Sequence, residues 1–217
     1  MVSSDDVARY LQANPKFFEE YADLLAQLYV PHPHGGRAIS ITERQILSLR
    51  EKSRGLEHKL AELIRFGEEN DAIGAKVHRL GLALIAASGL DAALRAAYAH
   101  LVEDFAVPHV AVRIWDAAPA DSGVEFAPVP DELRAAVLAL AHPYCGPANL
   151  PHIASLFGEA GNQVRSVAVV PLAGDSGCMG MLALASEDAR RFYAEMGTLF
   201  LGRIGEMVAA AISRKLG

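Results

Sequence analysis

The side chains with the most obvious chemical potential lie in one short stretch, HPYCGPANLPH. In this stretch Cys145 is followed by Asn149 and His152. A thiol that meets an imidazole and an amide can act as a nucleophile. Such partners come together in space rather than in sequence, so their proximity along the chain is weak evidence. The better-supported expectation is that Tyr144 and Cys145 pack against a sheet or line a pocket beneath it, with no catalytic residue.

Two further patterns suggest ligands but are better explained as turns. His32 and His34 form a His-x-His pair among prolines and glycines, yet a metal ion needs further ligands, and no cysteine or acidic cluster lies nearby. Gly174, Gly177 and Gly180 separate two predicted strands, so they fit a hairpin turn rather than a loop that binds nucleotide phosphates. We therefore expect neither a metal nor a cofactor.

Arg113 and Trp115 are the strongest candidates for contact with a ligand. They alternate with Val112 and Ile114 in a predicted strand, HVAVRIWD, and so project from one face of it. A guanidinium beside an aromatic ring can hold an anionic or planar ligand through hydrogen bonds and stacking. Equally, Arg113 could extend to the edge of an exposed sheet face while Trp115 fills the core. Strand alternation assigns the face and leaves both alternatives open.

The composition excludes several classes of function. The chain has 217 residues, 52% of them hydrophobic, which is enough for a substantial core in one or two domains. Its 20 basic and 26 acidic residues give a net charge of −6, so nucleic-acid binding is not expected. The sequence shows neither an apolar run long enough to span a membrane nor a secretory signal. With two cysteines, Cys145 and Cys178, the chain suits the reducing cytoplasm.

A helical arm is predicted for the first third of the chain. Short helices and a Pro/Gly loop are expected in residues 1–41, and a long helix in residues 42–76. In this helix apolar residues recur at alternating steps of three and four, as in a coiled coil, until glycines interrupt them after residue 63. We expect a homodimer, the alternative being an amphipathic helix packed on its own chain. The predicted dimer contacts are Ile46, Leu49, Leu56, Leu60 and Leu63.

The remainder, residues 77–217, is predicted to be one α+β domain. Apolar spacing indicates strands at 109–116, 165–173 and 179–186, the last two joined by a Gly-rich turn. A weak strand or loop is expected at 117–129, and an irregular crossover at 143–152. Helices are expected at 90–105, from Pro130 and at about 192–215. Strands joined by a hairpin with helices at both ends favour an antiparallel sheet flanked by helices.

Several of these segments resemble known families. The pattern SVAVVPL, GDSG and CMGMLALASEDARRF, followed by a long helix, is similar to the last hairpin and closing helix of GAF domains. The stretches PHPHGGRAIS, TERQ, YCGP, LFG and MGTLFLGRIGE resemble the GAF-like bacterial "domain of unknown function 484" family, over nearly the whole chain. The resemblance implies a GAF/PAS-like sandwich preceded by a dimerising helical arm. It implies no established activity.

A GAF-like sandwich would enclose a cavity between one sheet face and the crossover, and such cavities are common ligand sites. Its expected lining is drawn from the first strand, the crossover, the turn after it and the strand at 165–173. The candidate residues are Arg113, Trp115, Tyr144, Cys145, Asn149, Phe157, Arg165 and Ser166.

The leading functional hypothesis is a non-enzymatic cytoplasmic sensor or adaptor. It would bind an unidentified small molecule, dimerise through its long helix and act on a protein partner, because the sequence carries no output domain. The alternative hypothesis is an interaction scaffold whose GAF-like core is filled by its own side chains. A third hypothesis, an enzyme using Cys145, predicts an unusually reactive thiol.

Overall fold

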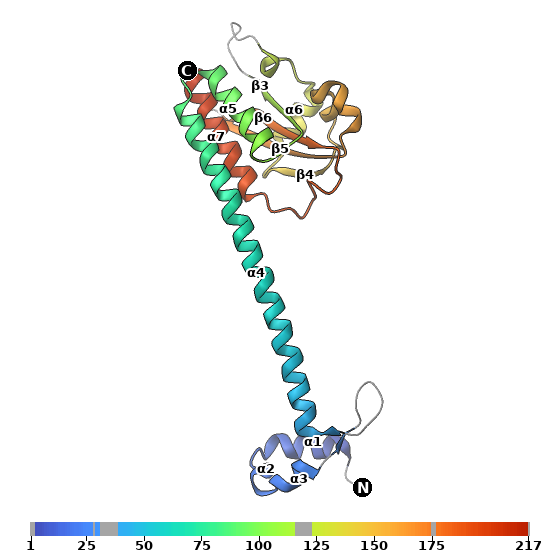
Figure 1. Ribbon diagram of the computed structural model, residues 1–217. Helices are drawn as coiled ribbons and strands as arrows, with labels where there is room; N and C mark the ends of the chain where they lie inside the picture. Colours follow the sequence, from blue (N-terminus) through green and yellow to red (C-terminus); the bar gives the residue numbers. More distant parts are fainter. Residues whose placement is uncertain (1–2, 28, 31–38, 116–122, 175–176, 217) are drawn as a thin grey trace. The chain divides into compact units, whose positions relative to one another are not determined.

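The computed structural model describes residues 3–27, 29–30, 39–115, 123–174 and 177–216 (Figure 1). Contacts divide the chain into two units, residues 1–68 and residues 69–217. The loop with His32 and His34, and most of the weak strand expected at 117–129, lie outside the described residues.

The first unit begins with short helices that bury little surface. Ser3 caps the first helix, because its hydroxyl accepts the Asp6 N–H while the Asp6 carboxylate accepts the Ser3 N–H. Aromatic rings supply most of the packing, with Phe17 stacked on Tyr21 at 4.9 Å between centroids. The elements are α1 (Ser4–Ala13), α2 (Phe17–Glu20), α3 (Ala22–Gln27) and the antiparallel pair β1 (Tyr29–Val30) and β2 (Ile39–Ser40).

One long helix, α4 (Ile41–Ala86), follows without interruption. The domain boundary expected at residue 77 therefore lies inside a helix. Beyond that point Val77, Leu80 and Leu84 are buried in the core of the second unit, and their burial favours continuation of the helix.

The second unit is built on a four-stranded antiparallel sheet, as the α+β prediction requires. The strands follow the order β3-β6-β5-β4, so the hairpin β5–β6 occupies the centre. The predicted crossover contains an edge strand, β4, that pairs with β5. Pro147 ends β4 without penalty because an edge strand needs its N–H groups on one side only. The strands are β3 (His109–Ile114), β4 (Tyr144–Pro147), β5 (Ser166–Gly174) and β6 (Gly177–Ser186).

Helices cover both faces of this sheet (Figure 1). The end of α4, α5 and α7 pack on one face, and α6 and η2 on the other. The segment VEF forms a 3₁₀ turn, η1, rather than the weak strand considered for it. The elements are α5 (Leu90–Glu103), η1 (Val124–Phe126), α6 (Asp131–Leu138), η2 (Ile153–Gln163) and α7 (Leu199–Leu216).

The closing helix starts later than the expected residue 192. Phe192 is buried in the core, and its N–H donates to the Ser166 hydroxyl. This anchor holds the chain in an irregular path before α7, which begins at Leu199.

Candidate functional site

Trp115 lies inside the second unit. Alternation along β3 places Ala111, Arg113 and Trp115 on the face beneath α6 and η2, as predicted. Trp115 is 8% exposed, and its indole N–H donates to the carbonyl of Cys178 at 2.9 Å. The guanidinium of Arg134 lies 5.4 Å from the centroid of the Trp115 ring. Trp115 is thus fixed by packing, a hydrogen bond and a cation–π contact.

The space between this sheet face and its helices is occupied by the chain's own side chains. Apolar residues from β3, β5 and β6 contact residues of α6 and η2 in one continuous cluster, and each is at most 8% exposed. A continuous cluster of buried apolar side chains of this kind is typical of a hydrophobic core. The cluster comprises Ala111, Trp115, Leu133, Val137, Ile153, Val167, Val169, Met181, Ala183 and Ala185.

Arg113 is the buried charge of this region. Its side chain is 7% exposed, and its Nη1 donates to the carbonyl of Val112 at 2.8 Å. A guanidinium has five N–H donors, so one bond leaves hydrogen-bonding capacity unused. Among the described residues, no carboxylate forms an ion pair with Arg113.

Tyr98 and Glu125 complete the outer edge of β3. The Val112 N–H donates to the Tyr98 hydroxyl at 3.3 Å, and this hydroxyl donates to Glu125 Oε1 at 3.0 Å. Burial raises the pKa of Tyr98 to about 12, since an ionised phenolate would lose its solvation there. Arg113 and Tyr98 together satisfy both backbone groups of Val112, so this edge is closed to another strand at that point. Tyr98 was not among the residues that the sequence analysis singled out.

The structure brings only some of the predicted pocket residues together, since Tyr144 and Phe157 pack against the cluster that contains Trp115. Tyr144 and Cys145 lie on β4, which β5 and β6 separate from β3. The Tyr144 hydroxyl donates to the carbonyl of Pro147 at 2.9 Å. Cys145 points to the opposite sheet face from Arg113 and joins the core beneath α5 and α7.

The remaining predicted pocket residues also have separate places. Ser166 is buried, and its hydroxyl donates to the carbonyl of Asp188 at 2.6 Å, so it joins two chain segments. Asn149 and Arg165 are exposed. Phe157 is half-buried, with its ring 6.3 Å from that of His109.

Cys145 lacks the surroundings of a catalytic thiol. Burial raises its pKa, which disfavours the thiolate that a nucleophile requires. His152 pairs instead with Glu132 of α6, on the other side of the sheet, at 3.0 Å. Among the described residues there is also no group of His, Cys, Asp or Glu that could hold a metal ion.

The predicted dimer contacts on α4 are all exposed. Ile46, Leu49, Leu56, Leu60 and Leu63 keep between 45 and 68% of their accessible surface. We call these five residues the leucine row. None of the residues that the structure describes buries this row.

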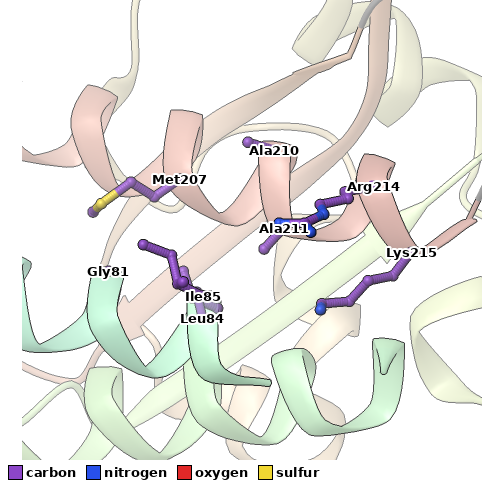
Figure 2. A pocket seen from close by; sticks show the side chains of 8 residues that line it. All are labelled: Gly81, Leu84, Ile85, Met207, Ala210, Ala211, Arg214 and Lys215. Carbon is purple, nitrogen blue, oxygen red and sulfur yellow. The ribbon is translucent and has the colours of Figure 1, made fainter. Parts of the chain in front are cut away.

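A shallow groove lies between α4 and α7 in the second unit (Figure 2). Its volume is about 280 Å³, and its walls are mainly apolar with two cations at one end. The Lys215 ammonium is already engaged, because it donates to the carbonyl of Ala87 at 2.6 Å near the end of α4. The groove is lined by Gly81, Leu84, Ile85, Met207, Ala210, Ala211, Arg214 and Lys215.

Comparison with protein families shows the family of this chain. The model of the family described as "Protein of unknown function, DUF484" matches residues 1–215. The chain belongs to the DUF484 family. No curated protein matches it, and in the part of the chain that the structure describes no helix has the length and apolar character to cross a membrane.

Solved structures similar to this DUF484 protein include two GAF domains and a reductase. The nlh2 GAF domain of A. aeolicus in an inactive state is 12% identical, with a TM-score of 0.51, over 67% of this chain and 98% of that one. A GAF domain from a phosphoenolpyruvate-protein phosphotransferase of Coxiella burnetii is 14% identical, with a TM-score of 0.47, over 66% and 94%. Free methionine-R-sulfoxide reductase from Neisseria meningitidis is 21% identical, with a TM-score of 0.44, over 64% and 87%. The first of these establishes the GAF-like fold.

The hydrogen bonds of Tyr98 generate a prediction about stability. Tyr98→Phe removes the hydroxyl that accepts from Val112 and should lower the free energy of unfolding by about 1 kcal/mol at pH 8. Because the folded pKa is raised above the unfolded one, the wild type should lose stability as pH rises from 10 towards 12, and the variant should lose less. Urea unfolding over this pH range measures both effects. Tyr193→Phe, at an exposed tyrosine, is the matched control, and equal behaviour of the two variants would contradict the prediction.

The burial of Cys145 generates a second prediction. In Cys178→Ser the remaining thiol should react with iodoacetamide at neutral pH more slowly than glutathione does, because its raised pKa and its burial both oppose attack. Mass spectrometry gives the rate of alkylation. Cys145→Ser, which keeps the half-buried Cys178, provides the comparison, and a Cys145 that reacts faster than glutathione would revive the enzyme hypothesis.

Proposed function

We propose that this chain is a non-enzymatic adaptor that works as a homodimer, with α4 joining two copies and the GAF-like unit presenting surfaces to a protein partner. The observation that carries the proposal is the leucine row, five large aliphatic side chains at coiled-coil spacing that stay exposed among the described residues. Full burial of such a side chain is worth about 1.5–3 kcal/mol. A second copy offers the same row at the same spacing.

Charges beside the leucine row support pairing between copies. With Ile46 at position a of the heptad, Lys52 takes position g and Glu57 takes position e. In a parallel coiled coil these positions face each other across the two helices, so Lys52 of one copy would pair with Glu57 of the other. Exposed pairs of this kind contribute little energy and mainly select register and partner.

The packed interior of the GAF-like unit favours an adaptor over a sensor. Trp115 and its neighbours occupy the face where the sequence suggested a ligand, and the eight candidate residues are divided among the two edge strands, the start of β5 and segments outside the sheet. The proposal places the protein in the cytoplasm, where the free thiols of Cys145 and Cys178 would stay reduced.

A small-molecule sensor is the second candidate, and Arg113 is the observation in its favour. A buried guanidinium is costly when it has no carboxylate partner, and the described residues supply none to Arg113, so an anionic ligand would remove that cost. This hypothesis requires a ligand that reaches Arg113 beside the filled core.

The adaptor hypothesis predicts the effect of charge in the leucine row. Leu56→Asp/Leu63→Asp should convert a dimer at micromolar concentration into a monomer, because four carboxylates would otherwise be buried between the helices. Sedimentation velocity measures the change.

Leu47→Asp/Ala61→Asp is the matched control, since it adds the same charges at exposed positions off the row. This control should remain dimeric. A row variant that stays dimeric would show that the contact lies elsewhere.

The two candidates differ in the mass of the purified protein. Native mass spectrometry after gentle purification should give two chains without an adduct. A reproducible adduct of a few hundred daltons that is lost in Arg113→Gln would establish the sensor instead. Intact far-UV circular dichroism of the variant would show that the loss is not due to unfolding.

A further inference from the structure

Three glycines continue the heptad pattern of α4 beyond the leucine row. Gly67, Gly74 and Gly81 occur at intervals of seven residues, in register with Ile46 and Leu60. A glycine inside a helix costs up to about 1 kcal/mol relative to alanine. A Cβ at Gly67 or Gly74 would meet nothing within 4 Å, so contacts within the chain do not require these glycines.

Large apolar side chains lie beside the last of these glycines. Ile85 follows Gly81 by four residues, on the same side of the helix, and is 75% exposed, the highest value among the exposed large hydrophobic residues of the described chain. Across the groove, Met207 of α7 approaches Gly81, where its sulfur would lie 3.1 Å from an added Cβ (Figure 2). We call Gly74, Gly81, Ile85 and Met207 the glycine face.

We propose that a second copy of this chain packs against the glycine face, so that the contact between two copies of α4 continues from Leu63 to Ile85. This inference rests on the proposed homodimer and extends it into the GAF-like unit. It gives a function to Gly74, which contacts within the chain do not require, because a helix without a side chain at this position lets a partner backbone approach closely.

The area needed by a dimer supports this extension. The leucine row is about 27 Å long at the rise of an α-helix, and a strip of helix width gives roughly 300 Å² per partner. A stable interface buries about 800 Å² per partner, so the row alone is too small. Continuing the strip to Ile85 about doubles the area, and Met207 with the neighbouring surface of α7 adds to it.

Continuity along one helix favours a second copy over an unrelated partner. The buried side of α4 near its end carries Val77, Leu80 and Leu84, which belong to the chain's own core. Gly74 and Gly81 share the heptad position of Ile46 and Leu60, whereas Val77 and Leu84, at the other seam position, are buried in the chain's own core. Ile85, one residue after Leu84, provides the exposed apolar side chain beside Gly81.

Substitution of Gly74 tests the proposal because its expected effect on the isolated helix and its expected effect on the dimer have opposite signs. Glutamine is a good helix former and meets nothing at this position, so Gly74→Gln should stabilise an isolated α4. If a second copy packs there, the same change should raise the dimer dissociation constant at least about tenfold. This corresponds to a loss of about 1.4 kcal/mol in the free energy of association. Sedimentation equilibrium of the full chain measures the constant.

Gly55→Gln is the matched control. Gly55 also lies in α4 with nothing within 4 Å of an added Cβ, but it falls outside the heptad seam. This variant should keep the wild-type dissociation constant. Ile85→Gln gives an independent test beside Val102→Gln, at an exposed apolar residue of α5, and only the former should weaken the dimer.

The outcomes separate this inference from the proposed function. If the charged leucine-row variant dissociates while Gly74→Gln and Ile85→Gln keep wild-type constants, the dimer exists and the glycine face is not part of it. If the wild type is a monomer at micromolar concentration, both proposals fail. Weakening by Gly74→Gln and Ile85→Gln, with both controls unchanged, supports the extended contact.

Discussion

The pairing of β5 with β6 is the interaction on which the second unit depends. These two strands form the centre of the sheet, and an edge strand pairs on each side of them. Both are buried along most of their length, so alternate side chains of the same strand supply the two cores. Val167 and Val169 face α6 and η2, while Ala168 and Val170 face α5 and α7. Loss of this hairpin would remove side chains from both cores at once.

The elements that the sequence predicted well are those with a long, uniform apolar period. The central hairpin, the first strand and the arm helix up to Leu63 have this property, and alternation was enough to place Arg113 and Trp115 on one face. The edge strand β4 was not recognised because it has four residues and ends in Pro147, so it offers no alternation to detect. The late start of α7 depends on a bond from Phe192 to Ser166, which local spacing does not encode.

The candidate pocket could be predicted less well than the fold. A strand pattern fixes which residues share a face within one strand, but not which strands are neighbours. Tyr144 and Arg113 were expected together, yet the strand order separates them by two strands. The link from Tyr98 to Val112 and Glu125 joins a helix, a strand and a turn, and only the folded chain brings these together. The regular spacing of the leucine row was accessible from sequence because a helix repeat needs no knowledge of the rest of the fold.

The uninterrupted course of α4 places a constraint on its length. Each residue turns a helix by about 100°, so adding or deleting one residue between Leu63 and Val77 would break the seven-residue spacing on which the heptad pattern of α4 depends. An insertion or deletion of seven residues nearly restores the angular position of the residues that follow. A change of two or five residues turns them to a different side of the helix. Length variants of this family that keep the heptad pattern should therefore differ by whole heptads in this segment. The length of α4 is constrained by the angle between successive residues as well as by the distance along the helix.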